Sequence, residues 1–216
     1  MSDTTSTVKH VIFDWNGTLL DDLGLAVSCV NRVTTKHLAK ATDADIYRSN
    51  FQFPIQNFYE SLGFDFESMA YEQLMHEYLS CFDVEVLDCG LHENAIDLLA
   101  NLKVKGVGVS VLSASEQNTL INCLQHFDVH PFFDFCFGLS CGAARGKIAR
   151  AQDLQTLLNE TSENILYVGD TLHDAEVAAE MNWRAVLFSG GHQNKGRLHA
   201  TGFPVVDDLR DIISFV

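Results

Sequence analysis

The 216-residue sequence has no apolar run of the length, about 20 residues, that a membrane-spanning helix requires. Its first ten residues, MSDTTSTVKH, lack the apolar core of a secretory signal. We therefore expect a soluble, cytoplasmic protein without a membrane partner, whose first residues lead into a strand. A monomer or a small homo-oligomer is expected.

Basic residues are scarce. The chain has 14 Lys and Arg against 29 Asp and Glu, which gives a formal net charge of −15. Nucleic acids and anionic membrane surfaces are themselves negative, so this balance argues against both as partners. An anionic substrate would need a local source of positive charge.

Cysteine pairs of the CxxC type are absent. The six cysteines are scattered: Cys29, Cys81, Cys89, Cys123, Cys136 and Cys141. Without metal-ligand spacing, we interpret them as reduced thiols rather than as zinc ligands or disulfides.

Beyond residue 85 the chain alternates between two kinds of segment. Short runs rich in apolar residues predict strands at 107–113, 132–139, 164–170 and 184–191. Apolar residues at helical spacing predict helices at 92–106, 115–127, 146–160 and 171–182. With a strand at Val8–Phe13 and a small strand and helix at 204–216, this alternation predicts an α/β fold. We expect a Rossmann-like parallel sheet with helices on both faces.

Residues 23–85 differ from the rest because their apolar residues follow helical spacing, with aromatics and a proline between two helical stretches. We interpret 20–85 as a small helical cap inserted after the first strand. Residues 1–19 and 86–216 then form the core domain.

Polar residues follow three of the predicted strands: Asp14, Ser113 and Asp170. Ligands of open α/β sheets bind beyond the carboxyl ends of the strands, so these residues mark the expected site. Asp174 lies one helical turn beyond Asp170. A cluster of carboxylates suits Mg²⁺, which prefers oxygen ligands.

Structural roles compete with this interpretation. Thr171 and Asp174 have the spacing of a capping pair at a helix start, and Ser113 or Ser115 can cap the helix that follows. Alternatively, Ser113 and nearby amides bind a phosphate at that helix N-terminus.

Two basic residues near a predicted helix start are candidates for the missing positive charge. Lys147 opens the helix in ARGKIARAQ, and Arg145 is a weaker competitor for the same role. A cation at a helix start opposes the macrodipole, so Lys147 needs another reason to be there.

The stretches DWNGTL, LSAS, GK and GDTLHD, in this order, resemble the four motifs of the haloacid dehalogenase superfamily of phosphatases. The wider pattern is similar to its phosphoglycolate phosphatase-like branch, and residues 20–85 match the helical cap of that branch. The resemblance implies a hydrolase that acts on a small anionic phosphorylated substrate.

The resemblance implies that Asp14 is the nucleophile and forms an aspartyl-phosphate. It implies Mg²⁺ bound by Asp14, Asp170 and the backbone carbonyl of Asn16. Metal and lysine would let an anionic carboxylate approach an anionic phosphate.

It also implies the residues that hold the transferring phosphoryl group, which are Ser113, Ala114 and Lys147. Asp174 would orient Lys147 or a metal-bound water.

The chain departs from the family pattern at Asn16, where family phosphatases usually carry a second Asp that transfers protons. An amide cannot do this near neutral pH, and losing such help lowers rates by about 10²–10⁴-fold. Either another group donates the proton, with His173 and His192 as candidates, or the substrate needs no donor.

Other reactions remain open. Phosphonate hydrolysis uses a cap lysine, but the chain has no lysine between Lys40 and Lys103. Haloacid dehalogenation needs no metal, so Asp170 and Asp174 argue against it, and phosphomutases depend on the missing Asp. A catalytically weak protein that binds a phosphorylated ligand is the alternative from another class.

The sequence leaves the identity of the substrate open. Arg48 is the candidate for binding a second anionic group. The nearby aromatic residues Phe51, Phe53, Phe58 and Tyr59 are more simply explained as the core of the cap.

Overall fold

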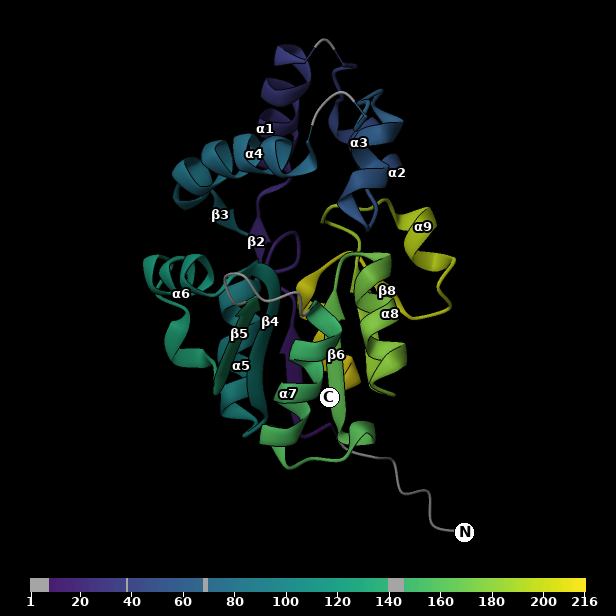
Figure 1. The fold of residues 1–216 in the computed structure, drawn as a ribbon. Coiled ribbons are helices and arrows are strands. Elements are labelled where there is room, and N and C mark those ends of the chain that lie inside the picture. Colours follow the sequence, from purple (N-terminus) through teal and green to yellow (C-terminus); the bar gives the residue numbers. More distant parts are fainter. Residues whose placement is uncertain (1–7, 38, 68–69, 140–145) are drawn as a thin grey trace.

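The computed structural model describes residues 8–37, 39–67, 70–139 and 146–216. Its centre is a six-stranded parallel sheet in the order β5-β4-β1-β6-β7-β8 (Figure 1). The strands are β1 (His10–Phe13), β4 (Gly108–Glu116), β5 (Phe135–Leu139), β6 (Ile165–Gly169), β7 (Arg184–Phe188) and β8 (Val205–Val206). The predicted α/β fold with a parallel sheet is confirmed.

Helices cover both faces of the sheet because successive strand residues point to opposite sides. Val11 and Phe13 of β1 pack with α5 (Ala95–Val104), α6 (Gln117–His126) and the C-terminal 3₁₀ helix (Leu209–Phe215). Ile12 packs on the other face with α7 (Lys147–Leu158) and α8 (Leu172–Glu180).

Residues 23–85, here called the helical segment, carry the helices α1 (Leu23–Lys36), α2 (Ala44–Asn50), α3 (Ile55–Ser61) and α4 (Tyr71–Glu85). The segment has a hydrophobic cluster of its own, which includes Val30, Tyr47 and Leu74. Its two connections to the sheet run through β2 (Leu20–Asp21) and β3 (Gly90–Leu91), which pair antiparallel. Figure 1 shows the segment above one edge of the parallel sheet.

Two C-terminal elements differ from the sequence prediction. The short helix α9 (Lys195–His199), capped by the Asn194 side chain, was not predicted, because five residues are too few to show a helical period. The last predicted helix is a 3₁₀ helix rather than an α-helix.

The interpretation of all cysteines as reduced thiols is wrong for one pair. Cys29 of α1 and Cys81 of α4 form a disulfide, with 5.9 Å between their Cα atoms. They are 52 residues apart, so no short motif reveals the pairing. Cys89, Cys123 and Cys136 are free, and Cys141 lies outside the described residues.

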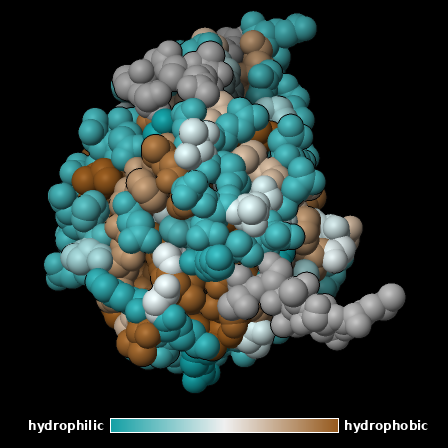
Figure 2. All heavy atoms as spheres, turned by 90° about the horizontal axis from the view of Figure 1, so that it is seen from below, coloured by the Kyte–Doolittle hydropathy of each residue, from teal (hydrophilic) through white to brown (hydrophobic). Residues whose placement is uncertain are grey.

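The surface agrees with the acidic, polar composition. Seen from below, hydrophilic residues cover most of the visible face and hydrophobic residues lie between them in smaller groups (Figure 2). None of the helices in the described part of the chain has both the length and the apolarity needed to cross a membrane. Residues 1–7 of the expected lead-in lie outside the described residues.

Candidate active site

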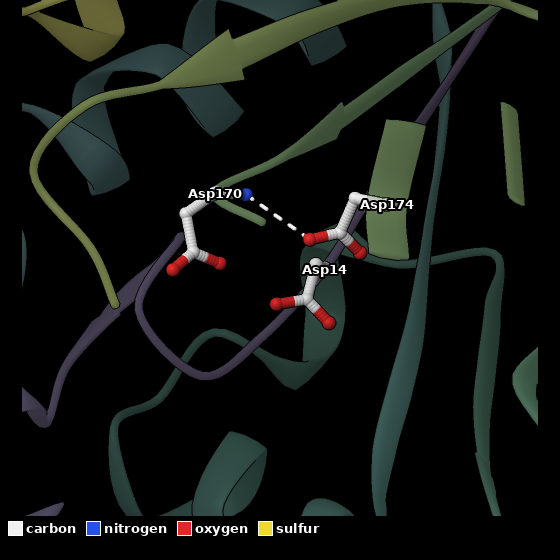
Figure 3. A group of neighbouring side chains, drawn as sticks. All are labelled: Asp14, Asp170 and Asp174. Atoms are coloured by element: carbon white, nitrogen blue, oxygen red, sulfur yellow. Dashed lines mark hydrogen bonds between the residues drawn. The ribbon is translucent and has the colours of Figure 1, made fainter. Parts of the chain in front are cut away.

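The candidate site lies where the order of the strands reverses. From β1 the chain runs to β4 and β5 on one side, and it then returns to β6 on the other side of β1. Such a reversal leaves a crevice at the carboxyl ends of the two central strands. Asp14 follows β1 directly and Asp170 follows β6, so the crevice receives both carboxylates (Figure 3).

Asp174 completes a cluster of three buried carboxylates. One oxygen each from Asp14, Asp170 and Asp174 lies within 4.8 Å of the others. Asp174 reaches this place because it is the third residue of α8, where it forms a capping box with Thr171. The capping interpretation of Asp174 is therefore confirmed, and it coexists with a place in the cluster.

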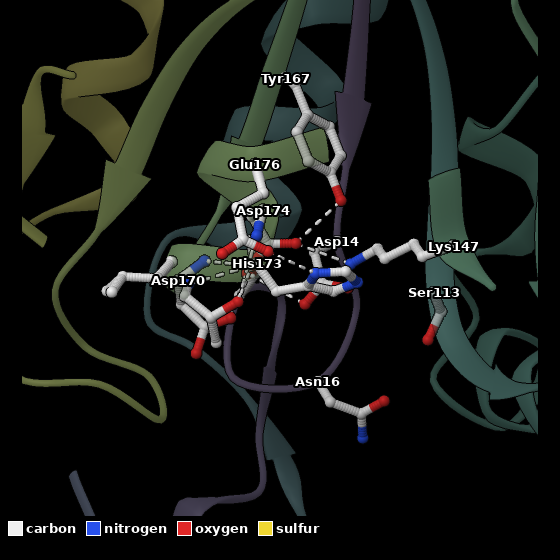
Figure 4. Close-up of polar contacts among 12 residues, drawn as sticks. Asp14, Asn16, Ser113, Lys147, Tyr167, Asp170, His173, Asp174 and Glu176 are labelled. Atoms are coloured by element: carbon white, nitrogen blue, oxygen red, sulfur yellow. Dashed lines mark hydrogen bonds and ion pairs between the residues drawn. The ribbon is translucent and has the colours of Figure 1, made fainter. Parts of the chain in front are cut away.

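Lys147 is the cation that faces the cluster. It is the first residue of α7, and its Nζ donates to Asp14 Oδ1 at 2.5 Å and to Asp174 Oδ1 at 2.7 Å. The hydroxyl of Tyr167 donates to the same Asp174 oxygen at 2.9 Å (Figure 4). Asp174 thus holds Lys147 beside Asp14. Arg145 lies outside the described residues.

The cluster contains more negative charge than Lys147 can balance. Burial, with the charges of Asp174 and Asp170, raises the pKa of Asp14 to about 8 although Lys147 opposes this shift. Burial raises the pKa of Asp170 to about 6. Burial favours the neutral form of Lys147, but the two carboxylates outweigh it and raise the lysine pKa.

This donor set fits a bound Mg²⁺. The three clustered ligand atoms are carboxylate oxygens, the kind that Mg²⁺ prefers, and their uncompensated charge would be neutralised by a divalent cation. The two sequence predictions, an oxygen-ligand cluster and a lysine beside it, meet at this edge of the sheet.

Asp170 is held in a fixed orientation. Its Oδ1 accepts from the Thr18 hydroxyl at 3.0 Å, and its Oδ2 accepts from the His192 backbone amide at 2.6 Å. Gly17, which has a φ of +75°, passes so close that a Cβ there would collide with Asp170 Oδ2 and the His192 ring. Glycine is required at this position for two reasons, its conformation and its lack of a side chain.

Two hydrogen bonds hold the Asn16 side chain away from the carboxylate cluster. Its Nδ2 donates to Asp22 Oδ2 at 2.9 Å, and its Oδ1 accepts from the Ser115 hydroxyl at 2.7 Å. Figure 4 shows its side chain apart from the contacts that join Asp14, Lys147 and Asp174.

Asp22 is a buried charged residue that the sequence prediction missed. It lies 3.2 Å from His192 Nε2, and both side chains are almost fully buried. Burial opposes the charge on His192, but Asp22 outweighs it and raises the histidine pKa to about 9. In the sequence, Asp22 only precedes a helix, so nothing distinguishes it from a helix-start carboxylate.

His173 and His192, the two candidate proton donors, both line the cavity above the cluster. His173 is held by Glu176, with Nδ1 3.1 Å from Oε2, and its ring lies 4.8 Å from that of Phe53.

The predicted phosphate-binding loop follows β4. Ala114 and Ser115 line the cavity, whereas Ser113 is buried and its hydroxyl accepts from the Ser115 amide at 3.0 Å. Neither Ser113 nor Ser115 caps α6, because Glu116 occupies the N-cap position and accepts from two amides of the helix. The capping interpretation of these serines is wrong.

A cavity of about 430 Å³ opens over the cluster between the sheet and the helical segment. Asp14 after β1 and Lys147 of α7 line it on the side of the core, and Phe51 and Tyr78 line it from the helical segment. Arg48 is not among its described lining residues, and its Nη2 donates to the carbonyl of Ser189 instead. The structure therefore contradicts the prediction that Arg48 faces a second anionic group.

Comparisons with known proteins identify a family and a shared fold. Residues 11–188 match the family model described as haloacid dehalogenase-like hydrolase. The tyrosine-protein kinase PtkA of Mycobacterium tuberculosis is 24% identical over 211 residues, covering 94% of this chain and 72% of that protein. Its solved structure superposes with a TM-score of 0.80 at 21% identity, over 96% of this chain and 97% of the other.

Two further solved structures share the fold. A protein from Clostridium acetobutylicum, described as a predicted phosphatase, has a TM-score of 0.83 at 20% identity and covers 97% of this chain and 98% of its own. One from Haemophilus somnus, described as a predicted phosphoglycolate phosphatase, has a TM-score of 0.77 at 17% identity, with coverage of 97% and 98%.

Proposed function

This chain belongs to the haloacid dehalogenase-like hydrolase family, and we propose that it is a Mg²⁺-dependent phosphatase acting on a small phosphomonoester. One observation carries the proposal. The Lys147 ammonium is bonded to Asp14 Oδ1, and Asp170 and Asp174 lie beside them at the floor of a cavity. This arrangement combines a carboxylate nucleophile, a fixed cation and an oxygen-ligand cluster.

The reaction has two steps. A carboxylate oxygen of Asp14 attacks phosphorus, a new P–O bond forms to Asp14, and the ester P–O bond breaks. The leaving alkoxide takes its proton from water. Water then attacks phosphorus, which releases inorganic phosphate, frees Asp14 and gives up a proton. Lys147 stabilises the phosphoryl charge throughout, and Asp174 keeps Lys147 in place.

Mg²⁺, when bound, supplies further positive charge for the phosphoryl oxygens. Asp14, Asp170 and the backbone carbonyl of Asn16 would hold it. Ser113 and Ala114 belong to the loop that would present amides to the phosphate, with Ser113 shaping the loop through the Ser115 amide.

Asn16 makes this enzyme selective for its leaving group. The amide is engaged by Asp22 and Ser115 and has no acidic proton to give, so departure of a basic alkoxide receives no help from position 16. We expect faster turnover of esters with acidic alcohols.

The helical segment would act as the cap over this site, within a division into residues 20–85 and a core of residues 1–19 and 86–216. Besides its chain connections, the segment is bonded to the loop after β7. The Asn194 amide donates to the carbonyl of Arg48, and Gln193 Nε2 donates to the carbonyl of Phe51.

The direct test measures phosphate release from p-nitrophenyl phosphate and from phosphoglycolate, with and without Mg²⁺. We expect Mg²⁺-dependent release that disappears in Asp14→Ala and is faster for p-nitrophenyl phosphate. Circular dichroism checks that the variant is folded. No release from either compound in any divalent metal would overturn the proposal and favour a protein that binds a phosphorylated ligand.

A second candidate function is phosphoryl transfer to a tyrosine, as the name of the relative PtkA suggests for that protein. The observation that favours it is again Asn16, because an amide cannot activate water and hydrolysis of a phosphorylated Asp14 would be slow. Incubation with labelled ATP and a tyrosine-containing peptide distinguishes the two. Label on the peptide supports transfer, and label released only as phosphate supports hydrolysis.

A further inference from the structure

The described residues that line the cavity offer no unpaired cation for a second anionic group, because His192, whose pKa is raised to about 9, is paired with buried Asp22. Lys147 is the only Lys or Arg among its described lining residues, and it is already paired with Asp14 and Asp174. The lining also includes Asp83 and Glu116, away from the carboxylate cluster. Among the described lining residues, a carboxylate on the substrate would therefore meet negative charge and no unpaired positive charge.

Three basic residues of the helical segment are paired with glutamates outside the cavity. Arg32 pairs with Glu85, and Lys36 pairs with Glu77 at 2.7 Å. His37 Nε2 also lies 2.9 Å from Glu77, and none of these basic residues is among the described residues that line the cavity.

An aromatic wall runs across the cavity instead. Tyr47 stacks on Phe51 with ring centroids 4.9 Å apart, and Phe51 meets Phe53 edge-on at 5.5 Å. The wall continues onto the sheet side, where Phe53 lies 4.8 Å from His173 and Phe51 lies 5.4 Å from His192. All five residues line the cavity.

The opposite wall, from α4, is apolar as well, and part of it is left uncovered. Met75, Leu79 and Phe82 line the cavity from this helix. Leu79 is 44% exposed and Phe53 is 37% exposed, although both are large hydrophobic side chains. Exposed apolar surface inside a cavity above a polar floor is typical of a small-molecule site.

Resting on the proposed phosphatase function, we propose that the substrate is the phosphomonoester of an aromatic alcohol that carries no second anionic group. The phosphoryl group would meet Lys147 and the carboxylate cluster at the floor, and the ring would lie against Phe51 and Phe53. A cavity of about 430 Å³ lies within the range of about 300–1,000 Å³ typical of small-molecule sites. The charge pattern disfavours a doubly anionic ester such as phosphoglycolate.

Binding of phosphonates tests this inference without requiring turnover. Isothermal titration calorimetry in Mg²⁺ compares phenethylphosphonate, propylphosphonate and phosphonopropionate, which differ only in ending in a ring, a methyl group or a carboxylate. We expect phenethylphosphonate to bind about 10- to 100-fold more tightly than propylphosphonate, from the apolar surface of the ring. Phosphonopropionate should bind most weakly of the three. Equal or tighter binding of phosphonopropionate than of phenethylphosphonate would overturn the inference.

Two variants locate the effect in the cavity. Phe53→Ala should weaken the binding of phenethylphosphonate about 5- to 20-fold, because contact area with the ring is lost. The affinity for propylphosphonate should change by no more than about 2-fold. Leu79→Arg adds a cation to the lining, so the variant should bind phosphonopropionate more tightly than phenethylphosphonate. Val84→Arg is the matched control, because Val84 lies on the same helix, is 76% exposed and is not among the described lining residues.

The outcomes separate the two proposals. If Leu79→Arg and Val84→Arg change phosphonopropionate binding equally, the cavity does not select the substrate and the inference fails. Hydrolysis of p-nitrophenyl phosphate, measured in parallel, reports on the phosphatase function alone. A preference for the aromatic phosphonate without any hydrolysis would support the inference about the ligand and overturn the enzymatic function.

Discussion

Asn16 and Asp22 are joined by a partly buried hydrogen bond in which the Asn16 side-chain amide donates to Asp22 Oδ2 over 2.9 Å. The same aspartate accepts from the Gly17 amide at 2.7 Å and pairs with His192. A carboxylate at position 16 would face that of Asp22 across this contact. An Asp at position 16, which the family usually carries, would therefore be repelled by Asp22 in this chain. This repulsion gives a physical reason for Asn at position 16.

We predict that Asn16→Asp lowers the free energy of unfolding by about 1–3 kcal/mol, because a donor is replaced by a like charge next to a buried carboxylate. Combining it with Asp22→Asn should recover at least half of this loss, since the exchange restores one amide and one carboxylate. Urea denaturation of the wild type, both single variants and the double variant measures the coupling. Additive losses would show that the two side chains do not interact.

Mg²⁺ should stabilise the fold through Asp170. At about 100 times its dissociation constant, a ligand of the folded state adds about 2.7 kcal/mol, which raises Tm by about 5–10 °C in a chain of this size. Asp170→Asn should raise Tm in EDTA, because it removes one of the repelling charges, and should abolish the Mg²⁺ effect. Thermal denaturation checks both. The exposed Asp97→Asn is the control, and a full Mg²⁺ shift in Asp170→Asn would contradict the prediction.

His10 should make the protein less stable in mild acid. Burial lowers its pKa to about 4, although Asp134 and Glu160 partly oppose the shift, and its Nε2 lies 2.7 Å from the Ser110 hydroxyl. Below pH 6.5 the unfolded chain binds a proton at this residue that the folded chain does not, so stability falls as pH falls toward 4. The loss is about 2 kcal/mol by pH 5.

Urea denaturation at pH 7 and pH 5 should therefore show a smaller difference for His10→Asn than for the wild type. The exposed His199→Asn provides the comparison. An identical loss of stability in His10→Asn and the wild type would mean that other groups cause it.

The Cys29–Cys81 disulfide should stabilise the protein by restricting the unfolded chain. We expect Cys81→Ser, or a reductant acting on the wild type, to lower the free energy of unfolding by about 2–4 kcal/mol. Cys89→Ser, at a free cysteine, is the control and should leave the response to reductant intact. A wild-type protein whose six thiols all react with iodoacetamide before reduction would contradict the disulfide.

Much of the fold follows from local sequence patterns. Short apolar runs identified the six parallel strands, and apolar residues at helical spacing identified the helices α5–α8. The predicted parallel sheet also placed Asp14 and Asp170 at one edge, since the carboxyl ends of parallel strands lie at the same side of a sheet. The terminal elements were predicted less well, because the five residues of α9 contain too little periodicity.

The tertiary structure alone decided which distant side chains meet. Asp22 and His192 are 170 residues apart, and the partners Cys29 and Cys81 are 52 apart, so neither pairing leaves a local pattern. Arg48 was predicted to be a free cation because the sequence does not reveal its partner. That partner is the backbone carbonyl of Ser189, and every residue has a backbone carbonyl. The sequence by itself determined the strand-end carboxylates and the lysine-bearing helix. Packing of the helical segment over the sheet decided that aromatic rings from this segment line the cavity above them, because such packing depends on contacts between elements that are distant in the sequence.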